Sequence, residues 1–262
     1  MRSMIQNHPV ATHFLLSVLI ASLVVIVAIL QMVLNPAAAA SMANFFNSVY
    51  GGHGYINLLT LLQAVPSDWT LLNIVIFAAA PTIAAILLAK AGLVGGLKRL
   101  FSRLKPVGPD GELGRSLALY TGLIAAYFAG LFIFDWVAGP GVNAYPRLGS
   151  FGLPVVLGAI VGLFLDEGGT LEELGWRGFA WPALLDAMKS PLGAALALGL
   201  LHWAWHLPRE VITLLGGASL PAFLIGQLVF LMLTIALAIV AGFCVNMTGG
   251  SVCWSSFPSS RS

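Results

Sequence analysis

Residues 13–34 read HFLLSVLIASLVVIVAILQMVL, an apolar run without a permanently charged side chain. As an α-helix this run would extend roughly 33 Å at about 1.5 Å per residue. The hydrocarbon core of a bilayer is about 30 Å thick, so a helix of this length can cross it. The run therefore predicts a first membrane-spanning helix.

Comparable apolar runs recur along the rest of the chain, at 70–93, 116–138, 192–207 and 221–245, with a broken stretch at 151–185. Hydrophobic residues make up 59% of the 262 residues and charged residues only 8%, whereas soluble domains average about 45–50% and 25%. We predict an all-α, polytopic transmembrane helix bundle with about six spanning helices.

The N-terminal run is preceded by Arg2 and followed by Pro36 and four alanines, which resemble a signal-peptide cleavage region. The run of ~20 residues is longer than the usual signal-peptide core of about 7–15 residues. We therefore expect an uncleaved first helix. The net charge of +2 arises almost wholly in loops, so no nucleic-acid partner is expected.

The distribution of Lys and Arg predicts the orientation. Residues 35–69 contain neither, whereas residues 90–115 contain Lys90, Lys98, Arg99, Arg103, Lys105 and Arg115. Cytoplasmic loops carry the excess of basic residues, so this loop and the N-terminus are expected in the cytoplasm, most simply of a bacterial cell. The short amphipathic piece 95–105 fits a helix in the lipid interface and a solvated basic loop equally well.

A polar motif interrupts the broken apolar stretch, where residues 171–178 read LEELGWRG. On a helix Glu173 and Arg177 are i, i+4 neighbours and can pair, while Glu172 points about 100° away. One carboxylate would be held by a cation, leaving the other to act as a base. A buried Glu–Arg pair that only fixes helix packing, with Glu172 at a water-filled crevice, is the alternative.

A histidine pair follows on the next apolar run, where residues 198–208 read LGLLHWAWHLP. His202 and His206 are four residues apart and share a helix face. This spacing fits a two-histidine metal site or a pair that holds water. It also fits two hydrogen-bonded core histidines.

The spacing around a predicted turn brings the two motifs together. Lys189, Ser190 and Pro191 form the obvious turn, with Glu173 16 residues before Lys189 and His206 16 residues after Ser190. In an antiparallel helical hairpin both would lie roughly 24 Å from the turn. A break at Gly178 or Pro182 would remove this common level but not the proximity of the two segments. We expect Glu172, Glu173 and His206 to approach a common polar pocket, with at least one carboxylate oxygen within about 6 Å of a His206 or His202 ring nitrogen.

A carboxylate, an imidazole and water in a membrane crevice suit hydrolysis, with imidazole, arginine or a metal stabilising the oxyanion. The order EExxxR, then HxxxH and Leu-Pro, resembles the CPBP family (CAAX protease and bacteriocin-processing), also called ABI-type intramembrane metalloproteases. Glu172, Glu173 and Arg177 match its first motif. His206 matches the histidine of its FxxxH motif, with His202 where the aromatic residue usually stands.

The resemblance implies an intramembrane endopeptidase with Glu172, Glu173, Arg177 and His206 as catalytic residues. It implies membrane lipid and a nearby peptide or protein as partners, with prenylated CAAX tails and bacteriocin leaders as substrate classes. A divalent metal such as zinc, held by His202 and His206, is left open by the sequence.

The sequence departs from the family at its third motif, a histidine followed four residues later by asparagine. No histidine follows His206, so we interpret the chain as truncated before that motif and expect weak or no activity. The expected organisation is N-terminal helices in 1–139 with a basic loop at 94–115, an incomplete CPBP-like core in 150–252 and an atypical tail in 253–262. A non-catalytic immunity or scaffold protein, an inactive relative and a proton-relay transporter are the alternatives.

Overall fold

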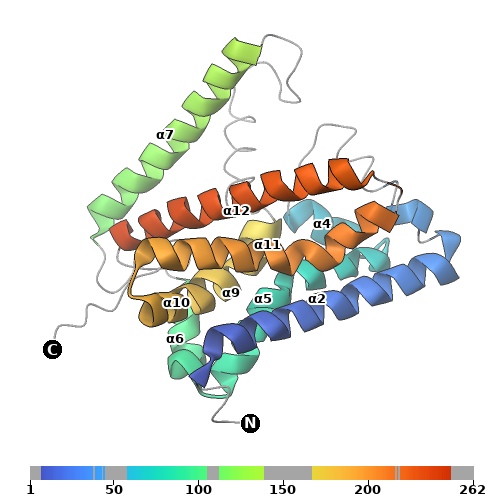
Figure 1. Ribbon diagram of the computed structural model, residues 1–262, viewed down its shortest axis with the longest axis horizontal. Coiled ribbons are helices and arrows are strands. Elements are labelled where there is room, and N and C mark those ends of the chain that lie inside the picture. Colours follow the sequence, from blue (N-terminus) through green and yellow to red (C-terminus); the bar gives the residue numbers. More distant parts are fainter. Residues whose placement is uncertain are drawn as a thin grey trace.

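The computed structural model describes residues 7–37, 39–42, 44, 58–104, 112–138, 167–215, 217 and 219–248. In these ranges every regular element is helical, which confirms the predicted all-α class. The nine α-helices described are α2 (Pro9–Leu34), α4 (Leu58–Ala64), α5 (Leu72–Lys90), α6 (Gly96–Ser102), α7 (Leu113–Ala138), α9 (Glu167–Gly175), α10 (Trp181–Met188), α11 (Pro191–Leu215) and α12 (Leu220–Thr248) (Figure 1). Two 3₁₀ turns, Trp69–Leu71 and Leu93–Gly95, and one π turn, Trp176–Ala180, complete them.

Three described helices are long and apolar enough to cross a membrane: Pro9–Leu34, Trp69–Lys90 and Leu220–Cys244. They coincide with three of the predicted runs, as expected of an integral membrane protein. The runs at 116–138 and 192–207 lie in the long helices α7 and α11. Residues 139–166 fall outside the described ranges, so the total of about six spans stays a prediction.

The outward faces of α2 and α12 are apolar, which suits contact with lipid. Leu15 on α2 and Ile225 on α12 are each 65% exposed. Side chains of this kind exposed over whole helices would form a large unfavourable surface in water. In a bilayer the same surface contacts acyl chains.

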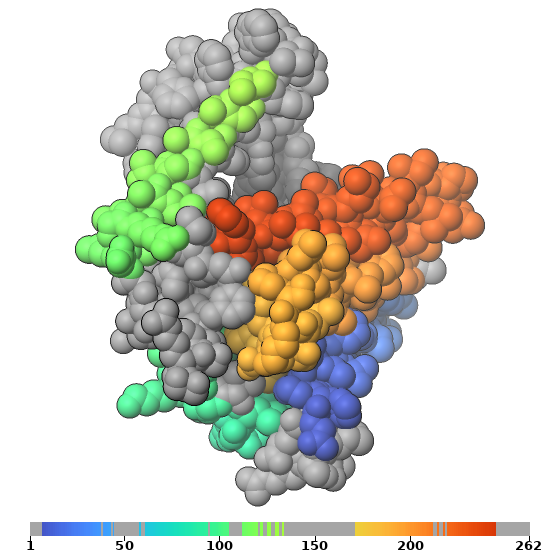
Figure 2. Space-filling model, turned by 60° about the vertical axis from the view of Figure 1, so that its left-hand side comes forward, coloured from blue at the N-terminus to red at the C-terminus, as the bar shows by residue number. Residues whose placement is uncertain are grey.

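The bundle core lies where α2, α5, α9, α10 and α11 meet, and α12 covers the other side of α11 (Figure 1). Trp176, Trp181 and Trp205 fill its centre. A Cβ atom at Gly199 would lie 2.6 Å from Ile235 Cα, so α11 and α12 approach at a small residue, as helices in membranes commonly do. α7 contacts α12 and stands away from the core (Figures 1 and 2).

The predicted turn between the two motifs is confirmed. α10 ends at Met188, and Lys189 takes a left-handed conformation with its N–H bonded to Leu185 O. Pro191 then begins α11, a position where its missing N–H leaves no bond unmade. α10 and the π turn both contact α11, so the two motif segments lie side by side as predicted.

The basic segment forms the helix α6 just after the α5 span. Leu100 is buried against α5, while Lys98 and Arg99 are exposed. Whether this helix lies at a lipid surface stays a prediction, and residues 105–111 lie outside the described ranges.

Candidate active site

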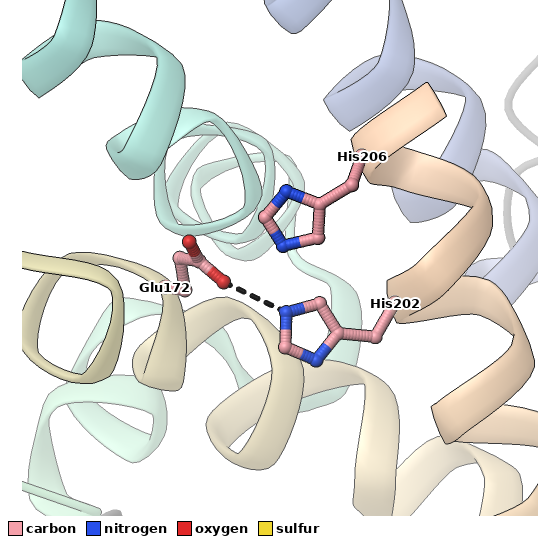
Figure 3. A group of neighbouring side chains, drawn as sticks. All are labelled: Glu172, His202 and His206. Atoms are coloured by element: carbon pink, nitrogen blue, oxygen red, sulfur yellow. Dashed lines mark hydrogen bonds and ion pairs between the residues drawn. The ribbon is translucent and has the colours of Figure 1, made fainter. Parts of the chain in front are cut away.

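Glu172 from α9 meets the two histidines of α11 in the interior of the bundle (Figure 3). Its Oε2 lies 2.9 Å from His202 Nε2, and all three side chains are buried. The rings of His202 and His206 stack with their centroids 5.2 Å apart. The predicted approach of a carboxylate to a histidine ring is confirmed, while the catalytic roles of these residues stay predictions.

Glu173 has different surroundings from Glu172. Its Oε1 accepts a hydrogen bond from Arg177 Nη1 at 2.8 Å, the predicted i, i+4 pair. The Arg177 side chain is 3% exposed and that of Glu173 25%. Of the two carboxylates expected in one pocket with His206, Glu172 has the oxygen that lies among the imidazole nitrogens.

The chain between the motifs is continuous through a π turn at Trp176–Ala180, directly followed by α10. Neither Gly178 nor Pro182 breaks it. Pro182 lies in the first turn of α10, directly after the π turn, and its nitrogen has no hydrogen to donate to that preceding turn. A π turn contains an extra residue compared with an α-turn and often marks a functional site.

Side chains from outside the helix hold both sides of this π turn. Gly175 N–H donates to Thr82 Oγ1 at 3.2 Å, and Arg103 Nη1 donates to Gly178 O at 2.6 Å. Burial, with the nearby Arg99, lowers the pKa of Arg103 to about 10, partly offset by Asp186. The guanidinium therefore stays charged at neutral pH, and its bond to a buried carbonyl is charge-assisted.

Aromatic side chains enclose the imidazoles. Trp176 lies 5.2 Å from His202, and Trp205 and Phe230 lie 4.5 Å and 4.9 Å from His206, measured between ring centroids. Electrostatic interactions between the enclosed polar groups are stronger than they would be in water.

Sequence reasoning missed His13, which is fully buried on α2. Its Nε2 lies 2.9 Å from Pro81 O, and its ring stacks on Phe179 and meets Trp176 edge-on. His13 thus links α2, α5 and the π turn. The available signal was a lone histidine in an otherwise apolar run, which by itself indicates no partner.

A second polar group missed by sequence reasoning lies one turn beyond His206. Arg209 donates from Nε and Nη2 to Glu210 Oε1, at 3.0 Å and 2.7 Å. Gln227 on α12 donates to Glu210 Oε2 and accepts from Trp203 Nε1. This network joins α11 to α12 next to the histidines.

The carboxylate of Glu172 and the imidazoles of His202 and His206 are chemical groups that bind metal ions. One carboxylate oxygen and two imidazole nitrogens lie within 4.8 Å of one another. A carboxylate and two histidines, with a fourth position open, are a ligand set of catalytic zinc. The group therefore could hold a metal, with Glu172 added to the predicted pair of histidines.

Comparison with known families gives a match over the segment that contains these residues. Residues 150–257 match the family described as type II CAAX prenyl endopeptidase Rce1-like, and both motifs lie inside the match. Residues 150–257 are thus a domain of the Rce1-like type II CAAX prenyl endopeptidase family, which confirms the resemblance stated from the motifs. Membership of this family implies an intramembrane protease. Neither a curated protein nor a solved structure matches the chain.

Proposed function

We propose that the chain is an intramembrane endopeptidase that hydrolyses peptide bonds at the membrane, with Glu172 activating the attacking water. One observation carries the proposal: Glu172 Oε2 lies 2.9 Å from His202 Nε2 in a buried, aromatic-lined interior. A carboxylate and imidazoles held together at membrane depth are costly to keep there and indicate function.

The proposed reaction assigns each proton to an atom. A water bound to Glu172 beside the imidazoles loses a proton to Glu172 as its oxygen attacks the substrate carbonyl carbon. An imidazole N–H of His206 or His202 donates to the developing oxyanion. The C–N bond then breaks as Glu172 returns the proton to the leaving amine.

Arg177 and Glu173 have a positioning role in this proposal. Arg177 is buried and lies one helical turn after Glu173. Its Nη1 donates a hydrogen bond to the Glu173 carboxylate. The ion pair fixes the helical segment that carries Glu172. Removing Glu173 would leave the buried Arg177 guanidinium without this partner, a change that typically costs about 3–5 kcal/mol.

A metal ion is proposed as an optional part of the site. Glu172, His202 and His206 are the residues that would hold it. When bound, such an ion would polarise a carbonyl oxygen and lower the pKa of water. In that state Glu172 would be a ligand, and Glu173 would be the nearest remaining carboxylate in the motif.

The proposed substrates are peptide or protein segments at the bilayer surface. The matched family's name gives prenylated CAAX ends as one class, and bacteriocin leaders are the other class that the resemblance implies. The enclosing aromatic side chains are consistent with an apolar segment beside the scissile bond.

The test is cleavage of such a peptide by the purified, membrane-reconstituted chain and its variants. We expect Glu172→Gln to lower the cleavage rate by about 10²–10⁴, the usual contribution of a general base. Asp186→Asn is the matched control, since Asp186 is largely exposed on α10, and it should leave the rate unchanged. Unchanged cleavage in the Glu172→Gln variant would contradict the proposal, and a chain without any Glu172-dependent cleavage would favour the scaffold alternative.

A further inference from the structure

The basic helix α6 lies at the level where a membrane-spanning helix ends. The candidate span Trp69–Lys90 has 22 residues and is therefore about 33 Å long, close to the thickness of the hydrocarbon core. Trp69 is 70% exposed at one end and Lys90 is exposed at the other, as is typical of residues at the two membrane–water interfaces. α6 begins at Gly96, shortly after Lys90, and packs back against α5. It therefore lies near the level of the lipid headgroups.

The residues of α6 divide into an apolar side and a basic side, because successive residues are rotated by about 100°. On the apolar side, Leu100 is buried and Leu97 partly buried in the cluster formed with α5, whereas Phe101 is 44% exposed. Lys98 and Arg99 are exposed on the other side. A helix of this kind is suited to lie in the membrane interface, with apolar side chains toward the acyl chains and charges among the headgroups.

The positive charge of this segment is not balanced by the segment itself. Residues 69–109 contain five basic side chains and neither Asp nor Glu. Within the described ranges, Lys98 and Arg99 have no ion-pair partner, whereas Lys189 Nζ lies 3.9 Å from Asp186 Oδ1. Basic side chains next to the cytoplasmic end of a spanning helix attract anionic lipid headgroups.

Contacts within the protein hold both ends of α6. At its start, the stem of Arg99 lies over Gly95, where a Cβ atom would overlap it. Gly95 also has a φ of 81°, a left-handed value that glycine adopts without strain. Just after the helix, Arg103 Nη1 donates to Gly178 O at 2.6 Å. The basic surface is thus already formed, and a ligand that binds it orders little of the backbone.

We propose that α6 is a binding surface for anionic phospholipids. Their headgroup phosphates pair with Lys98 and Arg99, while Phe101 contacts the upper part of the acyl chains. Phosphatidylcholine has the same phosphate but carries a compensating cation, so the surface distinguishes lipids by net charge. The inference is independent of the proposed peptidase, because it uses none of the residues assigned to the reaction.

The test uses the full chain reconstituted in phosphatidylcholine vesicles, with a fluorescent dye on Ser102→Cys and with Cys244→Ala and Cys253→Ala. Ser102 is exposed on α6. The probes are phosphatidylglycerol and phosphatidylcholine that carry the same nitroxide near the headgroup, which quenches only a dye that it approaches closely. We expect phosphatidylglycerol to reach half-quenching at about a five- to thirtyfold lower mole fraction, as for one or two basic residues near the surface.

Two variants locate the effect. Lys98→Gln combined with Arg99→Gln should make the two lipids quench equally. Lys189→Gln is the control, because Lys189 is 79% exposed but lies beside Asp186, and it should leave the preference unchanged. Salt at about 1 M, where the screening length falls to about 3 Å, should also reduce the preference. Since the two lipids are compared first with Lys98 and Arg99 in place, the comparison does not depend on the folding of the double variant.

Equal quenching by the two lipids would overturn the inference, and so would quenching by neither, because α6 would then be a solvated segment away from the lipid. A preference that survives the double substitution would place the anionic lipid elsewhere on the protein. Loss of the preference in millimolar inorganic phosphate at constant ionic strength would indicate a site for the free ion and would equally overturn it. None of these outcomes bears on Glu172-dependent cleavage, so the two proposals can fail separately.

Discussion

Glu172 and Glu173 have the same side chain one position apart, yet the helix gives them different surroundings. Successive positions on an α-helix are rotated by about 100°. That rotation turns Glu172 toward His202 at 2.9 Å and leaves Glu173 with Arg177 at 2.8 Å. The asymmetry could be predicted from the spacing EExxxR, because it depends only on helix geometry.

Zinc binding can be tested through stability, without any substrate. If Glu172, His202 and His206 hold the ion, zinc should raise the melting temperature of the detergent-solubilised chain. At a zinc concentration about 100 times Kd, the stabilisation is about 2.7 kcal/mol. His206→Ala should abolish this shift, whereas His8→Ala, an exposed position, should keep it. A shift that survives His206→Ala would place the ion elsewhere.

Gly175 lies at a close contact between α9 and α5, next to the Glu172–Arg177 motif. A Cβ atom there would overlap the backbone carbonyl group of Pro81 on α5. We expect Gly175→Ala to destabilise the protein by about 1–3 kcal/mol, the usual cost of overpacking, seen as a lower melting temperature. Gly226→Ala on α12 is the control, since nothing lies within 4 Å of its Cβ position. A melting temperature unchanged by Gly175→Ala would mean that α5 and α9 separate easily.

At the scale of elements, the α10–α11 hairpin could be predicted and the π turn could not. The hairpin follows from the equal spacing of Glu173 and His206 on the two sides of the turn Lys189–Pro191. All of these residues lie close together in the sequence. The π turn is held by Arg103 and Thr82, which lie 75 and 93 positions from their partners Gly178 and Gly175. Contacts of that separation leave no periodic pattern in a single sequence. The same holds for His13, whose partner Pro81 lies 68 positions away.

Arg103 should stabilise the π turn locally. A hydrogen bond from a charged group contributes about 1.5–3 kcal/mol, so Arg103→Gln should speed local amide exchange by about 10–100-fold. The measurement is hydrogen–deuterium exchange, followed in peptides that cover residues 171–188. Arg103→Lys, which keeps a cation, should have a smaller effect.

Arg99→Gln provides the control, because Arg99 is exposed on α6, the helix that Arg103 directly follows. Exchange in peptides from α12 should stay unchanged in all three variants. Equal protection of residues 171–188 in the Arg103→Gln chain would show that the π turn holds without the bond to Gly178.

At the scale of the whole molecule, the described basic residues of the segment that follows α5, Lys98, Arg99 and Arg103, gather at one end of the bundle. Arg103, which directly follows α6, binds Gly178 in the π turn, and Leu16 near the start of α2 packs against the apolar cluster that includes Leu100 of α6. Figure 1 shows α6 near the N-terminal end of α2. At the other end, Gln31 near the end of α2 binds Asn73 at the start of α5. α2 and α5 are therefore antiparallel, and Lys90 lies at the basic end.

This arrangement predicts which end faces the cytoplasm. Basic residues stay on the cytoplasmic side, so α6 and the start of α2 should lie there, and the 3₁₀ turn that precedes α5 should lie outside. Cysteine labelling checks this in a chain with Cys244→Ala and Cys253→Ala. In intact bacterial cells, a membrane-impermeant thiol reagent should label Ser67→Cys, and Ser102→Cys should react only after the membrane is opened.

Both positions are exposed, so burial cannot explain a difference between them. The same reagent applied to opened membranes is the control, and it should label both variants equally. Because α2 and α5 are antiparallel, a labelling result opposite to the expected one at either position would be enough to reject the predicted orientation. Labelling of Ser102→Cys in intact cells would put the basic helix α6 and the start of α2 outside, against the charge asymmetry that predicts the opposite orientation.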